Sequence, residues 1–181
     1  MDLVVTKWIG LSETARLARE YEEELSGRFP ADLLRDARNF QGLLSTDPEA
    51  GLAAGEGANY VKPLGAGGIF GALWEAGEEL SCGIEAELPV IPLRQETVEI
   101  CEFYDLNPYR IESSGSLLIG CAEGERMVRI LQEAGIHAAR IGRTTDRKER
   151  VILRREEKRY LTPPKEDDLR EMFVQRREDH A

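Results

Sequence analysis

The residues best suited to bind a ligand form a glycine-rich turn. Gly65, Gly67 and Gly68 follow a short strand-like run ending at Pro63, and an amphipathic helical pattern begins directly after them. Glycines at the start of a helix allow positive φ angles and let a ligand approach backbone N–H groups that lack a helical partner. The turn therefore favours an anion, often a phosphate. The spacing matches neither the P-loop nor the dinucleotide fingerprint, and a tightly packed turn that binds nothing is the alternative interpretation.

A second polar loop lies at the start of an apolar strand pattern. Its residues are Ser113, Ser114 and Gly115, whose hydroxyls and backbone N–H groups could contact a ligand. The alternative is an ordinary turn into a strand, in which serine bonds to nearby backbone. The predicted ligand-binding residues are Gly65, Gly67, Gly68, Ser114 and Gly115.

The sequence contains few of the residue combinations that catalysis needs. His137 lies in a strand pattern and His180 is the penultimate residue, and neither has a metal-ligand neighbour at useful spacing. There is no nucleophile elbow and no zinc-protease motif. We predict no metal site and assign no catalytic residue. Three widely spaced cysteines lie in apolar patterns, which is typical of buried free thiols in a reducing, cytoplasmic compartment: Cys82, Cys101 and Cys121.

The overall charge limits which kinds of partner the chain is expected to bind. A formal net charge of -10 argues against nonspecific nucleic-acid binding, and no apolar run is long enough to span a membrane. No secretion signal is present at the N-terminus. Residues 140–160 nevertheless contain nine Lys/Arg against four Asp/Glu. This segment is either a solvated hairpin with internal ion pairs or a surface for phosphate or a partner.

Helical and strand patterns alternate along the 181 residues, which predicts an α/β or α+β fold with a mixed sheet in a single domain. Strands are expected near residues 3–8, 60–63, 83–88, 116–121, 136–141 and 151–155. Helices are expected at seven places: from the N-cap Ser12 to about Leu25, from Pro30, from Asp47, after Gly68, and over residues 94–105, 124–134 and about 165–178. The helix at 94–105 is expected to bury Val98, Cys101 and Tyr104.

Four ordered sequence blocks carry a resemblance to a known family. They are Val-Val-Thr-Lys-Trp-Ile-Gly-Leu (4–11), Gly-Gly-Ile-Phe-Gly-Ala-Leu-Trp-Glu (67–75), Ile-Pro-Leu-Arg-Gln-Glu-Thr (91–97) and Ser-Ser-Gly-Ser-Leu-Leu (113–118). Together they resemble the C-terminal domain of the aminoimidazole ribonucleotide (AIR) synthetase-related superfamily, nearest the hydrogenase maturation factor branch. The superfamily also includes selenophosphate synthetase and thiamine monophosphate kinase. The resemblance covers essentially the whole chain.

The resemblance implies a mixed β-sheet flanked by helices, with partial ferredoxin-like topology. Within this domain, the residue patterns predict a helical insert at about 12–55 and a C-terminal helix at about 165–178. In complete members, ATP lies in the cleft between this domain and an N-terminal domain that supplies most magnesium ligands. Gly67 and Gly68 match the family's paired glycines, and Ser114 and Gly115 match its polar strand entry. The family's His-Asp-x-Thr-Glu-Gly-Gly turn here reads Lys-Pro-Leu-Gly-Ala-Gly-Gly (62–68), without the acid, base and hydroxyl groups.

The resemblance and the missing groups leave three readings of function. The first is the substrate- and phosphate-binding half of an ATP-dependent AIR synthetase-related enzyme, inactive alone and completed by an N-terminal-domain partner chain, with ATP and magnesium bound only in the completed protein. The second is a non-catalytic binding or regulatory module that kept the fold. The third, a complete small enzyme, lacks a visible catalytic constellation. The face that the missing domain would cover predicts self-association, for example as a dimer.

Overall fold

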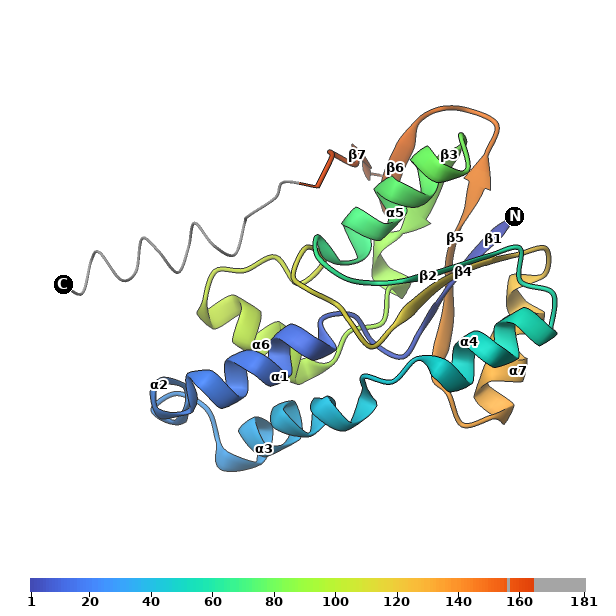
Figure 1. Cartoon of the computed structure of the whole chain (residues 1–181). Coiled ribbons are helices and arrows are strands. Elements are labelled where there is room, and N and C mark those ends of the chain that lie inside the picture. The colour runs from blue at the N-terminus through green and yellow to red at the C-terminus, as the bar shows by residue number, and fades with distance from the viewer. Residues whose placement is uncertain (156, 165–181) are drawn as a thin grey trace.

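The computed structural model describes residues 1–155 and 157–164 (Figure 1). Seven strands form one sheet in the order β2-β4-β1-β5-β3-β6-β7. Their bounds are β1 Asp2–Thr6, β2 Tyr60–Pro63, β3 Gly83–Glu87, β4 Leu117–Cys121, β5 Ala138–Thr145, β6 Arg150–Arg154 and β7 Glu157–Tyr160. Strands β3 and β6 pair in parallel, and the other pairings are antiparallel. This mixed sheet between helices confirms the predicted fold class.

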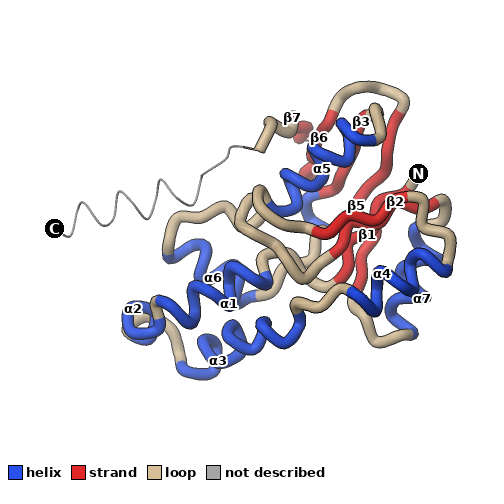
Figure 2. Tube along the Cα trace, in the orientation of Figure 1, coloured by secondary structure: helices blue, strands red, loops and turns tan. Residues whose placement is uncertain are grey.

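The helices lie on both faces of the sheet and beyond one end of it (Figure 2). Their bounds are α1 Leu11–Glu20, α2 Glu22–Ser26, α3 Ala31–Asn39, α4 Asp47–Gly55, α5 Gly68–Glu79, α6 Gln95–Phe103 and α7 Gly124–Glu133, with short 3-10 turns η1 Phe40–Leu43 and η2 Leu88–Val90. Within the described residues no helix has the length and apolar character needed to cross a bilayer.

Strand alternation divides the core between the two faces of the sheet. On β1, Leu3 and Val5 point to the face covered by α5, whereas Val4 points to the face covered by α4 and α7. All three side chains are fully buried. Successive residues of a strand face opposite sides of the sheet, so a strand that helices cover on both faces needs consecutive apolar residues such as these three.

Helices α1, α2, α3 and α6 form a separate layer with its own apolar cluster (Figure 1). Leu17 of α1, Leu34 of α3 and Ile100 of α6 are buried in it. The Tyr104 hydroxyl donates a hydrogen bond to Glu24 Oε2 at 3.1 Å, which satisfies the polar end of an almost fully buried ring. This layer packs beside the end of β1 and supports the loop that follows it.

The first helix differs from its prediction at both ends. It begins at Leu11, after Gly10 in the left-handed conformation (φ 74°), so Ser12 is not its N-cap. Ser12 Oγ instead donates to the Glu112 backbone oxygen at 3.3 Å. The helix also breaks at Tyr21 (φ -116°, ψ 32°), so the predicted single helix is two.

Other predictions are corrected in detail. Val98 is 38% exposed, while Cys101 and Tyr104 are buried as predicted. Strand β7 was not predicted, because its charged sequence has no apolar alternation. The cysteines are free, as predicted, but Cys82 is only partly buried. The helix predicted at about 165–178 lies outside the described residues.

Candidate functional site

The glycine turn connects strand β2 to helix α5. Gly67 (φ 79°) and Gly68 (φ 61°) are both left-handed, a conformation that costs other residues about 1–2 kcal/mol. The Gly68 N–H donates to the Gly65 oxygen at 3.1 Å, and the Gly71 N–H donates to the Gly67 oxygen at 2.9 Å. The positive φ angles predicted for a glycine turn are therefore present at two of its three glycines.

Gly68 is also required by packing. A Cβ atom there would lie 2.6 Å from the backbone oxygens of both Tyr109 and Ile111. The Phe70 N–H donates to the same Tyr109 oxygen at 3.1 Å. Close packing therefore accounts for Gly68 without any ligand. Gly65 is different, because nothing lies within 4 Å of the Cβ position there.

The two predicted loops meet in the structure. The Ser113 N–H donates to the Gly65 backbone oxygen at 3.2 Å, which joins the glycine turn to residues 113–115. Ser114 Oγ lies 2.5 Å from Glu112 Oε1, so its hydroxyl already has a local partner. Gly115 (φ 104°) packs against Leu44, where a Cβ would lie 2.8 Å from the Leu44 side chain.

Ser113, rather than Ser114, ties this loop to the β1–α1 connection. Ser113 Oγ accepts a hydrogen bond from the Gly10 N–H at 2.9 Å and donates to the Ile111 oxygen at 3.0 Å. The side chain is fully buried. Ser116 Oγ donates to the Trp8 oxygen at 2.7 Å, so the whole loop is fastened to the end of β1.

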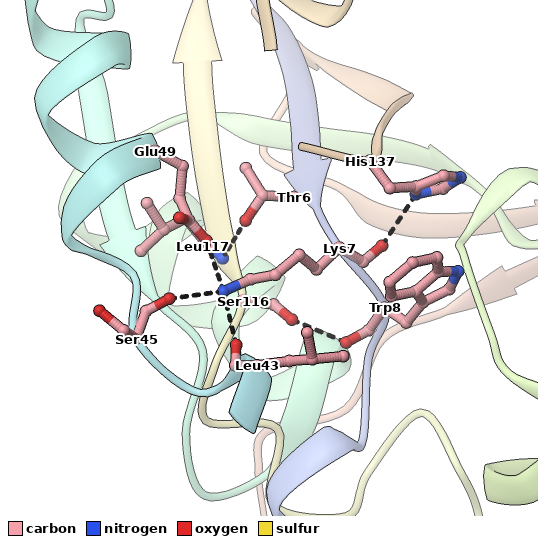
Figure 3. Close-up of polar contacts among 9 residues, drawn as sticks. All are labelled: Thr6, Lys7, Trp8, Leu43, Ser45, Glu49, Ser116, Leu117 and His137. Carbon is pink, nitrogen blue, oxygen red and sulfur yellow. Dashed lines mark hydrogen bonds and ion pairs between the residues drawn. The ribbon is translucent and has the colours of Figure 1, made fainter. Parts of the chain in front are cut away.

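A buried lysine next to this loop was missed by sequence reasoning. Lys7 has a left-handed backbone (φ 53°) and is 8% exposed. Its Nζ donates to the backbone oxygens of Leu43 and Ser45, each at 2.7 Å, and lies 2.6 Å from Glu49 Oε1 (Figure 3). Glu49 is 2% exposed. A lysine directly after β1, in the mostly apolar run at residues 3–8, was the available signal, because buried charges need partners.

Lys7 joins the segment from the end of η1 to the first turn of α4 to the sheet. Three acceptors, 36 to 42 positions away in sequence, surround one ammonium group (Figure 3). Its backbone also pairs with His137, whose oxygen accepts from the Lys7 N–H at 2.6 Å. The His137 ring stacks on Trp8 with centroids 4.8 Å apart. Packing against Trp8 therefore holds the His137 ring in place, in agreement with the structural role expected for this residue.

The chain near the end of the described residues covers part of the turn. A Cβ on Gly67 would lie 3.2 Å from Pro164 Cβ, and one on Gly71 would lie 3.7 Å from it. The Arg110 guanidinium donates to Thr162 Oγ1 at 2.7 Å, which holds this segment nearby. Part of the turn therefore already has a protein neighbour.

The charged groups around the turn are paired locally. Lys62, at the end of β2, lies 3.0 Å from Glu75 and 2.6 Å from Glu79. Among residues 1–155 and 157–164, no three His, Cys, Asp or Glu side chains gather as a metal site would need. Chemically, the described turn and loop contain backbone N–H groups and small polar side chains rather than groups for proton transfer. The N–H groups of Gly68, Phe70 and Gly71 already donate to backbone oxygens of the protein.

A mixed sheet sandwiched by helices, with a glycine turn and a serine loop joined at the start of α5, defines an α/β domain. The chain belongs to the family described as AIR synthase related protein, C-terminal domain, whose sequence pattern matches residues 3–154. The resemblance found in the four sequence blocks is thereby confirmed.

Known proteins similar to this chain are longer. It is 34% identical over 74 residues to a carbamoyl dehydratase HypE of Rhodobacter capsulatus, covering 41% of this chain and 22% of that protein. The crystal structure of E. coli HypE matches with TM-score 0.71 and 20% identity over 94% of this chain and 52% of that one. Hydrogenase maturation protein HypE in complex with ATP matches with TM-score 0.64, 17% identity and the same coverage. The chain thus spans about half the length of these solved structures, which share its fold.

Proposed function

We propose that this chain is the substrate- and phosphate-binding half of an ATP-dependent AIR synthase-related protein of the hydrogenase maturation type. The supporting observation is the hydrogen bond between the Ser113 N–H and the Gly65 oxygen. It places the glycine turn and the serine loop side by side at the start of α5. A solved relative of this fold is a complex with ATP.

In this proposal the chain is inactive alone. It spans 52% of the length of the HypE structures that it matches. The turn from Lys62 to Gly68 offers no carboxylate or imidazole for metal binding or proton transfer. Magnesium ligands and acid–base groups then come from a complementing N-terminal domain on a partner chain. The chain alone is expected to hold the phosphates of ATP at about millimolar affinity, and tight binding of ATP with magnesium requires both halves.

A second candidate is a non-catalytic binding or regulatory module. Two observations favour it: Pro164 packs against Gly67, and close backbone packing already accounts for Gly68. In this case the turn stabilises the fold, and the module acts by binding a partner.

Self-association is a further part of the proposal. Strands β2 and β7 are the two edges of the described sheet, and unpaired strand edges are ready to pair with another chain. Val61 on β2 is 37% exposed and Tyr160 on β7 is 64% exposed. Sedimentation velocity is expected to show a concentration-dependent dimer, and a monomer at all concentrations would remove this part.

Calorimetric titration of magnesium-ATP tests the choice between half-enzyme and module. The variant Gly65→Asp adds a carboxylate at a position where the Cβ has open space, so the fold is preserved. Gly68→Asp is unsuitable, because its Cβ would collide with two backbone oxygens. Gly51→Asp on α4, also in open space, is the matched control.

The half-enzyme proposal predicts binding at about millimolar affinity or tighter. Gly65→Asp is expected to weaken this binding at least about tenfold through charge repulsion at the phosphates, whereas Gly51→Asp is expected to leave it unchanged. Absence of binding by the wild-type chain favours the module. Equal binding by all three proteins would mean that ATP binds at a site other than the turn.

A further inference from the structure

The basic segment at residues 140–160 separates into paired and unpaired cations. Five members have carboxylate partners: Arg140 with Asp2, Arg143 with Glu85, Arg150 with Glu78, Lys158 with Glu149 and Arg159 with Glu157. Among the described residues the remaining four form no ion pair: Arg147, Lys148, Arg154 and Arg155. The predicted hairpin with internal ion pairs therefore accounts for only part of the segment.

Two of the four unpaired cations line a pocket. Arg154 ends β6 and Arg155 follows it, whereas Arg147 and Lys148 lie in the turn at the opposite end of that strand. The pocket has a volume of about 990 Å³, and its lining is Leu88, Pro89, Tyr109, Arg154, Arg155 and Glu157. Pockets for small ligands and cofactors are commonly about 300–1,000 Å³. A mononucleotide-sized molecule therefore fits this space.

The pocket also lies where the sheet topology favours a ligand. Strands β3 and β6 are the parallel pair, with Glu87 opposite Leu153 at their carboxyl ends. Leu88 and Pro89 follow β3, and Arg154 and Arg155 complete β6. In doubly wound parallel sheets, ligands bind beyond the carboxyl ends of the strands; the pocket lies at the equivalent position of the parallel pair in this mostly antiparallel sheet.

The lining consists of a cationic side, an apolar side and the Glu157 carboxylate, which is paired with Arg159. Two guanidinium groups provide planar, multiple donors that match the oxygens of a phosphate. The half-buried Tyr109 ring, already stacked on Phe70 with centroids 5.2 Å apart, offers an aromatic surface next to Leu88 and Pro89. Burial raises the pKa of Tyr109, and the charge of Arg154 acts in the opposite direction, which reflects how near the two side chains are.

Arg155 is held in an unusual backbone conformation. Its φ is 55°, in the left-handed region where a residue with a side chain is strained. Strained residues gather at binding sites, where the strained backbone aims a side chain. Glycine or asparagine would satisfy this turn more easily, so the presence of arginine is informative.

From these observations we propose that the pocket binds a phosphorylated small molecule that carries a flat ring. Arg154 and Arg155 hold the phosphate, and Tyr109, Leu88 and Pro89 receive the ring. This site is separate from the contact of ATP with the glycine turn and does not depend on it. Tyr109 links the two places, since its backbone oxygen accepts from the Phe70 N–H in the first turn of α5.

The test uses adenosine monophosphate (AMP) as a probe with both a ring and a phosphate. Calorimetry without magnesium compares AMP with adenosine, which lacks the phosphate, and with inorganic phosphate, which lacks the ring. The test variant is Arg154→Gln with Arg155→Gln. The matched control is Arg147→Gln with Lys148→Gln, which removes the same charge at the other end of β6. Circular dichroism verifies that both variants are folded.

The proposal predicts that AMP binds more tightly than either fragment. The pocket variant is expected to lose about tenfold or more of the affinity, the effect of removing charge-assisted hydrogen bonds, and the control none. No AMP binding up to about 5 mM, or equal losses in the two variants, overturns it. Loss of AMP binding in Gly65→Asp but not in the pocket variant also overturns it, because the probe is then at the glycine turn. Failure of ATP to bind at that turn leaves the AMP result unaffected.

Discussion

Replacing Lys7 with methionine keeps a side chain of similar length and removes the ammonium shared by Leu43, Ser45 and Glu49. Apart from this ammonium, no hydrogen-bond donor among the described residues reaches Glu49 Oε1. At 2% exposure, Glu49 gains little from water. The variant therefore leaves a buried carboxylate and two backbone oxygens without their shared cation.

The expected loss is large for one substitution. Breaking a buried ion pair from one side costs about 3–5 kcal/mol, against a total stability of about 5–15 kcal/mol for a native domain. The double variant Lys7→Met with Glu49→Leu buries no charge and leaves only the two backbone oxygens unpaired, at about 1 kcal/mol each. We therefore expect a loss near 3 kcal/mol for Lys7→Met and near 2 kcal/mol for the double variant. The double variant is the more stable of the two.

Urea unfolding followed by circular dichroism measures both values, and a double-mutant cycle with Glu49→Leu isolates the interaction. Arg35→Met, which breaks the exposed pair with Asp32, is the control and is expected to cost less than about 0.5 kcal/mol. A loss below about 1 kcal/mol for Lys7→Met, or a double variant whose loss equals the sum of the single ones, would refute the reasoning. In either case Lys7 would not hold α4 to the sheet.

Three further outcomes follow from individual contacts. Gly77→Ala puts a Cβ 2.3 Å from Arg150 Nε, and Arg150 is held in place by its ion pair with Glu78 and its contact with the Trp74 ring. The variant is therefore expected to cost about 1 kcal/mol in urea unfolding despite alanine's better helix propensity; a gain would contradict the packing. Burial by itself raises the pKa of Asp2, but a backbone N–H at the start of α7 and a guanidinium from β5 lower it below 3.8. Asp2→Asn is therefore expected to lower the free energy of unfolding by about 0.5–1 kcal/mol at neutral pH. The difference between variant and wild type should vanish as pH falls through the lowered pKa of Asp2, because the wild-type carboxyl is then protonated. A stability difference that does not change with pH would count against this reasoning. Burial raises the pKa of Cys101 to about 12, so almost none of it is the reactive thiolate near pH 8. Iodoacetamide should therefore modify the partly exposed Cys82 much faster than Cys101, and equal rates would be inconsistent with the fold.

The elements with clear periodicity were predictable from the sequence. Helix α5 begins at Gly68, the last residue of the predicted glycine turn, and β4 covers the apolar run ending at Cys121. Local patterns suffice where an element buries one face or both faces evenly. Strand β7 has charged and polar residues at all four positions, and its place at the edge of the sheet comes from pairing with β6.

Parts of the site that depend on distant contacts were not predictable. Ser113 and Ser114 are equivalent in a local pattern, and only the approach of Gly10, 103 positions away, makes the first of them the buried anchor. Gly68 looks like a ligand-binding glycine until the backbone at Tyr109 and Ile111 is brought against it. Such roles depend on which segments meet, and a single sequence does not contain that information.

Nuclear magnetic resonance titration of the whole chain with magnesium-ATP tests the central claim most directly. The backbone amide signals of Gly65, Gly67, Gly68, Ser114 and Gly115 report on the two joined loops. The proposed function predicts that their chemical shifts change together and saturate with one affinity, while the signal of Gly51 on α4 stays constant. Shift changes confined to other parts of the chain, or none at all, would contradict phosphate binding at the glycine turn.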